Sequence, residues 1–288
     1  MPKFQLKDLD VFYISFDEMN CDANWERIRD LHPNAKRVHG VVGFDKVHRV
    51  CALSTETRRF VTIDGDNWVN DGTFDYQLDD TNIEDVCFSF KSRNIINNLE
   101  YGNGGIKVWD RDTFLSSRTH ENANTTDFYW DIRYWQVDYH ASTTVNNCTP
   151  YQAWRAGYRE GIKMSYIDAA PPDDFIKQWK SIFRFNLSRL SVWSSVGRDI
   201  DNGIWAVLGA RQAISDLISK EIEHTCINDY KWFIDKWDQV AKVNPDAVAR
   251  SLRDKINDLG FYIPEMDAQQ SAWFKIVYVN PKREGLMR

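Results

Sequence analysis

The chain has 288 residues, 43% of them hydrophobic and 27% charged, which is typical of a globular protein with one large domain or two small ones. Its net charge of −6 argues against a protein that coats nucleic acid phosphates nonspecifically, although a local basic groove is compatible with that total. The five cysteines form no CxxC pair and no apolar run is long enough to cross a membrane, so we expect a cytoplasmic protein without zinc, disulfides or membrane contact.

The first 66 residues alternate between strand-like and helical segments. Apolar runs predict strands at 11–16 and 35–43 and a third within RFVTIDGD, residues 59–66, and apolar residues at helical spacing predict helices at 23–33 and 44–56. This alternation predicts an α/β domain with a parallel sheet, and in such sheets ligands bind outside the carboxyl ends of the strands.

Two carboxylates follow the third predicted strand, in the triplet Asp64-Gly65-Asp66. Asp17 and Glu18 follow the first predicted strand, so we expect all four acidic side chains at the same edge of the sheet. Gly65 would permit a ligand to approach the backbone closely. Paired carboxylate oxygens suit Mg²⁺ or Mn²⁺, and these ions in turn bind diphosphates. The triplet therefore predicts a metal site for a nucleotide sugar.

Two other interpretations of this acidic triplet stay open. In a phosphatase of the haloacid dehalogenase type, the first Asp would be a nucleophile and the second an acid–base group. That family places the motif on the first strand with Thr after it, whereas here it follows the third strand and precedes Asn67-Trp68, so this alternative ranks lower. The other is a loop of solvated Asp residues, because an Asp-x-Asp triplet is common.

Further strands are predicted at 85–94, after a glycine-rich turn within 98–112, and at 129–142. An amphipathic helix is predicted at 149–168, where Thr149-Pro150 is typical of a helix start.

The composition changes after Pro171-Pro172 and becomes mainly helical as far as residue 260. The run FKIVYV near the end predicts a closing strand. We therefore expect a catalytic domain at 1–170 and a mainly helical part at 171–288 that completes the acceptor side.

The glycine-rich turn YGNGGIK, residues 101–107, would bring backbone amides close to a ligand, although a tight hairpin explains its glycines equally well. His140 belongs to an aromatic predicted strand. A single His is more often a hydrogen-bonded core or surface residue than a ligand. It is a candidate third metal ligand only because two carboxylates are already proposed.

Several segments, in this order, resemble a group of phage and bacterial glycosyltransferases of the GT-A type: SFDEMNCDANWERIRDLHPNAKRVHGVVGFDKVH, FVTIDGDNWV, LEYGNGGIKVW and NNCTPYQAWRAGYREGIKM. The resemblance spans roughly residues 10–212. It implies a GT-A fold, which is an α/β domain of two abutting Rossmann-like halves with a mixed, mostly parallel sheet. For a phage protein, the compartment would be the host cytoplasm.

The resemblance implies a nucleoside diphosphate sugar as the donor, with uridine as the usual base. The nucleotide would lie over the first strand near Phe16, Asp17 and Glu18, with Arg37 and residues 39–48 closing round it. The sugar would contact the turn that contains Asn103, Gly104 and Gly105, and Arg155 and Arg159 would contact the diphosphate or the acceptor. An alternative for the two arginines is a solvated helix face paired with neighbouring acids.

The resemblance also implies a divalent metal, Mn²⁺ or Mg²⁺, as the cofactor. Asp66, helped by Asp64 and His140, would bind this ion, which offsets charge on the departing nucleoside diphosphate. An inverting enzyme needs a carboxylate base for the acceptor hydroxyl, and Asp127 and Asp131 are the candidates. Either could instead be an ordinary turn or strand-end Asp, and the stereochemical outcome stays open.

Members of this group in phages add sugars to hydroxymethylated pyrimidines in DNA, so the resemblance implies 5-hydroxymethylcytosine in DNA as the acceptor, with glucose, arabinose or a similar sugar transferred. Basic residues near the glycine turn and a basic, aromatic segment at 177–190 could contact a DNA backbone or a flipped base. An ordinary amphipathic helix with a solvated basic face explains the same segment. The alternatives are a transferase for a glycan, lipid carrier or protein, or a noncatalytic protein that binds nucleotide sugars.

Overall fold

The computed structural model describes residues 3–81, 83, 85–101, 105–165, 182 and 184–277. Contacts divide the chain into two compact units, the first reaching Asn94 and resuming over Glu100–Val145, the second comprising Ile95–Leu99 and the chain from Asn146 onward. This division precedes the predicted helix at 149–168, while the boundary expected near Pro171-Pro172 lies outside the described residues. The first unit is α/β and the second is helical.

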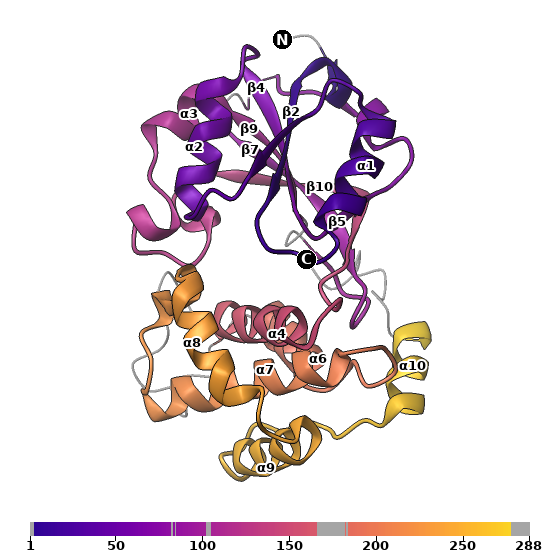
Figure 1. Cartoon of the computed structure of the whole chain (residues 1–288), viewed down its shortest axis with the longest axis vertical. Coiled ribbons are helices and arrows are strands. Elements are labelled where there is room, and N and C mark those ends of the chain that lie inside the picture. Colours follow the sequence, from indigo (N-terminus) through magenta and orange to yellow (C-terminus); the bar gives the residue numbers. More distant parts are fainter. Residues whose placement is uncertain are drawn as a thin grey trace. The chain divides into compact units, whose positions relative to one another are not determined.

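In the described part of the chain, the first unit contains an eight-stranded sheet with the order β3-β2-β4-β9-β7-β10-β5, and β8 pairs with β7 off this path (Figure 1). The strands are β2 (Asp10–Ser15), β3 (Lys36–His39), β4 (Arg59–Asp64), β5 (Asn67–Val69), β7 (Cys87–Asn94), β8 (Glu100–Tyr101), β9 (Ile106–Asp110) and β10 (Tyr134–Thr144). A small separate sheet pairs β1 (Phe4–Gln5) with β6 (Gln77–Leu78).

The first strands are parallel, as the alternation of strands and helices predicts, and the sheet as a whole is mixed, as the resemblance implies. The strands β2, β3 and β4 are parallel, as predicted, and β10 is parallel to β7. The strand β9 is antiparallel to both of its neighbours, β4 and β7, so the sheet is mixed. The antiparallel β9 separates two groups of strands that share one direction.

Helices cover both faces of this sheet (Figure 1). On one face, α1 (Cys21–Leu31) buries Ile28 in a core with β2, β4, β7 and β9. On the other, α2 (Phe44–Ser54) and α3 (Arg111–Ser116) pack Cys51, Ala52 and Phe114 around Trp109. The indole Nε1 of Trp109 donates to Thr62 Oγ1 at 2.8 Å, which satisfies a polar group inside this apolar core.

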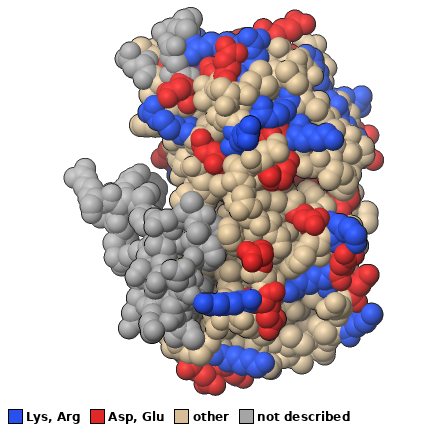
Figure 2. Space-filling model, turned by 90° about the vertical axis from the view of Figure 1, so that its left-hand side faces the viewer, with Lys and Arg blue, Asp and Glu red and all other residues tan. Residues whose placement is uncertain are grey.

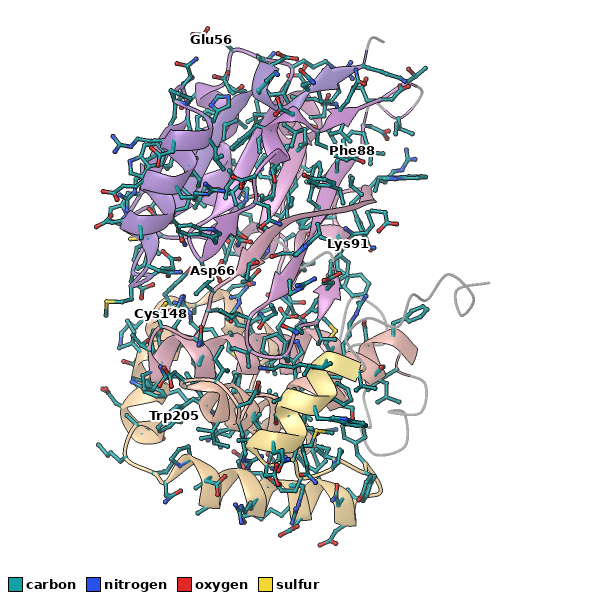
Figure 3. The ribbon with its side chains drawn as sticks, turned by 90° about the vertical axis from the view of Figure 1, so that its right-hand side faces the viewer. Glu56, Asp66, Phe88, Lys91, Cys148 and Trp205 are labelled. Atoms are coloured by element: carbon teal, nitrogen blue, oxygen red, sulfur yellow. The ribbon has the colours of Figure 1, made fainter. Side chains whose placement is uncertain are left out.

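The parallel strands fix where the acidic residues lie. Because β2 and β4 run in the same direction, their carboxyl ends, at Ser15 and Asp64, meet at one edge of the sheet. Glu56, before β4, and Asp66, after it, lie at opposite ends of this strand in Figure 3. The sheet therefore positions the acidic turn at its carboxyl edge.

The outer strand β10 has an irregular free edge. In the described chain β5 joins β10 only at residues 142–144, and Asn70 donates to the carbonyl oxygens of His140 and Ala141. Residues 134–137 pair with β7, while Asp138 and Tyr139 fall between the paired positions. Register shifts interrupt its pairing between Val137 and Ser142. Asp138, which is 86% exposed and paired with Lys91, lies within this irregular stretch.

The second unit consists of helices in the described residues. They are α4 (Pro150–Met164), α6 (Arg184–Trp193), α7 (Gly203–Ser219), α8 (Tyr230–Val240), α9 (Pro245–Asp258) and α10 (Ala268–Val277). Thr149 caps α4 by accepting the N–H of Gln152, as the Thr-Pro pair predicts. No described helix is both long enough and apolar enough to cross a membrane.

Glycines let α4 and α7 approach closely. A Cβ at Gly157 would come within 2.0 Å of the backbone oxygen of Ala206, and one at Gly209 within 2.2 Å of that of Trp154. Any larger residue at either position would force the two helices apart.

The predicted closing strand FKIVYV is wrong over its described residues, because residues 268–277 form the helix α10. The reason is local: Asp267 Oδ1 accepts the N–H of Gln270 at 2.8 Å, and Gln270 Oε1 accepts the N–H of Asp267 at 3.0 Å. This reciprocal pair is a capping box, which starts a helix whatever the β propensity of the residues that follow.

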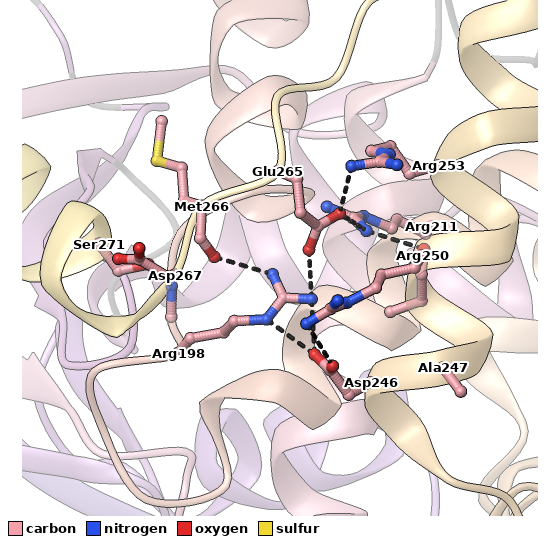
Figure 4. A network of polar contacts seen from close by, with 12 residues as sticks. Arg198, Arg211, Asp246, Ala247, Arg250, Arg253, Glu265, Met266, Asp267 and Ser271 are labelled. Atoms are coloured by element: carbon pink, nitrogen blue, oxygen red, sulfur yellow. Dashed lines mark hydrogen bonds and ion pairs between the residues drawn. The ribbon is translucent and has the colours of Figure 1, made fainter.

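An arginine–carboxylate network connects the helices of the second unit (Figure 4). The fully buried Arg211 donates to the backbone oxygens of Ser194 and Ala249 and to Glu265. Arg198 joins Glu265 to Asp246 at the start of α9. Burial lowers the pKa of Arg211, and Glu265 opposes that shift. The network ties α7 to α9 and to the segment before α10.

Candidate functional site

Two side chains, one from β2 and one from α1, hold the backbone of the turn after β4 in place. The hydroxyl of Tyr13 donates to the carbonyl oxygen of Gly65 at 2.7 Å, and Asn24 Nδ2 donates to the same oxygen at 2.9 Å. Burial raises the pKa of Tyr13, so its hydroxyl keeps the proton that it donates. The backbone between the two carboxylates is therefore fixed.

The acidic turn and the glycine turn meet. The N–H of Asp64 donates to the carbonyl oxygen of Gly105 at 2.8 Å, and a Cβ at Gly105 would lie 2.6 Å from Cβ of Asp64. Only glycine permits this approach. The acidic triplet and Gly105, which are far apart in the sequence, are therefore in direct contact. Asn103 and Gly104 lie outside the described residues.

Lys107, two residues after this glycine, brings a positive charge to the acidic turn. Its Nζ lies 3.9 Å from Asp64 Oδ2 and 5.4 Å from the centre of the Phe128 ring. The Lys107 side chain is only 11% exposed, so its charge is weakly screened, whereas Asp64 is 42% exposed. The sequence placed Lys107 only among the basic residues near the glycine turn that could contact DNA, and did not predict its contact with Asp64, because that contact joins two separate strands.

The loop after β2 carries the expected nucleotide residues. The N–H of Phe16 donates to Glu18 Oε2 at 2.7 Å, and a Cβ at Gly65 would come within 2.6 Å of that oxygen. Glu18 therefore lies against the acidic turn, as the edge argument predicts, and Asp17 beside it is exposed. Arg37 donates to Ser15 Oγ at 2.9 Å and to Asp22 at 2.7 Å, so it packs beside the loop.

The two candidate bases, Asp127 and Asp131, flank the short 3-10 helix Phe128–Trp130 that precedes β10. Asp127 accepts the N–H of Phe128 at 2.8 Å, and Phe128 is the ring that contacts Lys107. Thr125 donates to Asp131 Oδ2 at 2.6 Å. Burial raises the pKa of Asp131 despite that bond, which is the direction a general base requires. Asp127 is thus linked to the acidic turn through Phe128 and Lys107.

His140 lies on β10 and already has a partner. Its Nε2 accepts the N–H of Arg93 at 3.0 Å, so metal coordination through this nitrogen would require that bond to break. Burial lowers the pKa of His140. Among the described residues, no group of three or more His, Cys, Asp or Glu side chains is arranged to hold a metal, so the structure does not gather His140 with Asp64 and Asp66.

The donor set still fits a divalent cation of the Mg²⁺ class. Such an ion takes one or two protein carboxylates and fills its other positions with water and substrate phosphate oxygens. Asp64 and Asp66 provide two carboxylates from one rigid turn at a partly exposed edge. These residues could hold the ion together with a diphosphate, without a third protein ligand.

The two candidate arginines of α4 belong to the second unit. Arg155 lies over the rings of Tyr151 and Tyr230, and Arg159 donates to the carbonyl oxygen of Ile227. Both therefore contribute to the packing of the helices, and their contact with a diphosphate stays a prediction. Of the basic segment 177–190, residues 177–181 and 183 lie outside the described residues.

Comparison of the sequence with models of known protein families and with curated proteins found no match.

Proposed function

We propose that the chain is a metal-dependent glycosyltransferase that moves a sugar from a nucleoside diphosphate, with uridine the expected base, to a hydroxymethylated base in DNA. One observation carries the proposal: the turn Asp64-Gly65-Asp66 meets Gly105 at the carboxyl edge of parallel strands. That edge is where α/β sheets bind nucleotides. The carboxylate oxygens at this edge suit a divalent cation, and backbone N–H groups of a nearby turn suit the diphosphate that the cation would accompany.

The order of the strands supports a fold of the GT-A type. The strand β9 runs against β4 and β7, so β2, β3 and β4 form one parallel group and β7 and β10 another. The resemblance implies two abutting Rossmann-like halves with a mixed sheet, and this grouping of strands is compatible with that expectation.

The roles of the residues follow from their positions. Asp64 and Asp66 would hold Mn²⁺ or Mg²⁺, which supplies positive charge to the departing nucleoside diphosphate. Lys107 would add a second positive charge beside Asp64, where low exposure strengthens its electrostatic effect. Asp127 or Asp131 would accept the proton of the acceptor hydroxyl.

DNA as the acceptor rests on the resemblance rather than on surface charge. On the face drawn in Figure 2, Lys and Arg alternate with Asp and Glu in both parts of the chain, so no large region of one sign is visible there. A DNA contact on that face would have to use individual basic residues and not a broad electrostatic surface.

The test is incubation of the protein and Mn²⁺ with a panel of nucleoside diphosphate sugars and with hydroxymethylated or plain DNA. Nucleoside mass spectrometry should show a sugar mass gain on the hydroxymethylated base only. Metal-dependent donor hydrolysis without any gain on DNA would keep the transferase and point to a glycan, lipid or protein acceptor. Binding of a donor that is never hydrolysed or transferred would indicate a noncatalytic protein.

A further inference from the structure

The side chain of Asn67, the residue directly after the acidic triplet, is 1% exposed and lies between the two motifs. Its Nδ2 donates to Asp66 Oδ1 at 2.8 Å. Its Oδ1 lies 2.8 Å from Ser142 Oγ and 3.4 Å from the backbone N of Gly105. One amide group therefore contacts the acidic turn, the glycine turn and β10.

Hydrogen-bond chemistry fixes the orientation of this amide. The N–H of Gly105 can only donate, so the Asn67 oxygen must face it. The hydroxyls of Ser92 and Thr144 lie on the same side, 3.4 Å and 3.3 Å from that oxygen. The amide N–H groups must then face Asp66, whose carboxylate can only accept when ionised. The resulting hydrogen bond is assisted by charge and is stronger than a neutral one.

We propose that Asn67 is a positioning residue for the cation site: it fixes the carboxylate of Asp66 and links it to the glycine turn. This inference rests on the proposed function, because the cation is part of that proposal. Partners of this kind, which bond to a ligand and not to the metal, typically contribute about 10-fold to 100-fold in metal affinity. Because the Gly105 N–H and the hydroxyls of Ser92, Ser142 and Thr144 all lie around the Asn67 oxygen, no single one of them sets the orientation of the amide, which is fixed before any cation arrives.

The experiment measures Mn²⁺ affinity without donor, from the electron paramagnetic resonance signal of the free ion. Asn67→Ala should weaken Mn²⁺ binding by about 10-fold or more at a temperature where thermal unfolding shows the variant folded. Ser142→Ala is the matched control, because it removes a donor to the Asn67 oxygen and leaves the bond to Asp66. It should lower stability but change Mn²⁺ affinity by less than about twofold.

Unchanged Mn²⁺ affinity in folded Asn67→Ala would overturn the role of Asn67 and leave the transferase proposal intact. Equal weakening by Asn67→Ala and Ser142→Ala would also overturn it, because the effect would then be general loosening. A wild-type protein that binds no Mn²⁺ and transfers no sugar would remove both proposals.

Should Asn67→Ala not fold, Asn67→Asp replaces it, since it keeps the accepting oxygen and the shape of the side chain. The two adjacent carboxylates then repel, and a crystal structure should show Asp66 displaced from its wild-type position. An Asp66 side chain that stays in place would contradict the proposal.

Discussion

The N–H of Asp64 donates a 2.8 Å hydrogen bond to the carbonyl oxygen of Gly105, so the acidic turn after β4 and the glycine turn before β9 fix each other. A shift of the backbone at Asp64 should therefore also displace Gly105, and a shift at Gly105 should displace Asp64. The predictions below test the chemistry of this junction and the packing within each of the two units.

Replacing Asp66 by Ala should abolish sugar transfer and leave the fold intact. The substitution removes one of the two carboxylates proposed to hold the cation, and transition-state charge stabilisation of several kcal/mol corresponds to a loss of about 100-fold or more in donor turnover. Asp71→Ala is the control, since Asp71 is 88% exposed and pairs only with Arg27 among the interactions described for it. Donor hydrolysis assays should separate the two, and full Asp66→Ala activity in chelator would contradict a metal-dependent reaction.

Replacing Gly105 by Ala should lower both stability and activity. The new Cβ would lie 2.3 Å from Asn67 Nδ2 and 2.6 Å from Asp64 Cβ, and overpacking of this kind costs about 1–3 kcal/mol. Gly65→Ala should cost less, because its Cβ meets the end of the flexible Glu18 side chain. Urea denaturation compares the two variants, and a Gly105→Ala protein as stable as wild type would show that the turns can separate.

Stability should fall in mild acid through His48, a buried residue of α2 whose Nδ1 lies 2.7 Å from the carbonyl oxygen of Phe44. Burial lowers the pKa of His48 in the folded state, so the unfolded chain binds more protons as the pH falls below about 6.5. The stability that neutral His48 contributes is therefore fully present above the pKa of this histidine in the unfolded chain, and it is lost as the pH falls below that value.

His48→Gln removes this titration and should flatten the acid side of the stability profile. Urea midpoints measured between about pH 5 and about pH 8 give the difference between the two proteins. Burial also lowers the pKa of His140 and His224, so the difference between wild type and variant is the quantity to compare. Parallel profiles would show that His48 does not titrate differently on unfolding.

Arg211→Met should destabilise the helical unit by about 3 kcal/mol or more, because removing a buried charged partner leaves its acceptors unpaired. The acceptors are the backbone oxygens of Ser194 and Ala249. Arg250→Ala should change stability by less than about 0.5 kcal/mol. Arg250 forms an ion pair with Asp246, and their side chains are 59% and 42% exposed, respectively. Denaturation followed by tryptophan fluorescence tests both, and similar midpoints would show that the Arg211 network is dispensable.

Local sequence patterns were sufficient for the first strands and helices and insufficient for the arrangement of the later strands. Alternating strand and helix signals predict β2, α1, β3, α2 and β4 and their parallel order, because short crossover connections leave few alternatives. The reversed direction of β9 is not a property of its own residues, since IKVW would suit either direction. It depends on which strands β9 pairs with, and this pairing lies outside any local pattern.

The candidate site shows the same division. Asp64 ends the strand β4 and Asp66 follows it, so both carboxylates could be placed from the sequence at the sheet edge. Lys107 and Asn67 could not, because their roles depend on contacts with distant residues such as Phe128 and Ser142. The helix α10 was a different kind of error, since the capping pair that starts it was present in the sequence and was overlooked.

The irregular outer half of β10 has a consequence for how copies of the chain meet in solution. An exposed strand edge can accept a strand from a second molecule, and this is a common route to aggregation. Here the register shifts after Val137 disturb the spacing of the backbone donors, and Asp138 would bring an unfavourable charge into the new pairing. Asp138 and the irregular pairing after Val137 therefore act against strand addition from a second copy at this edge of the described sheet.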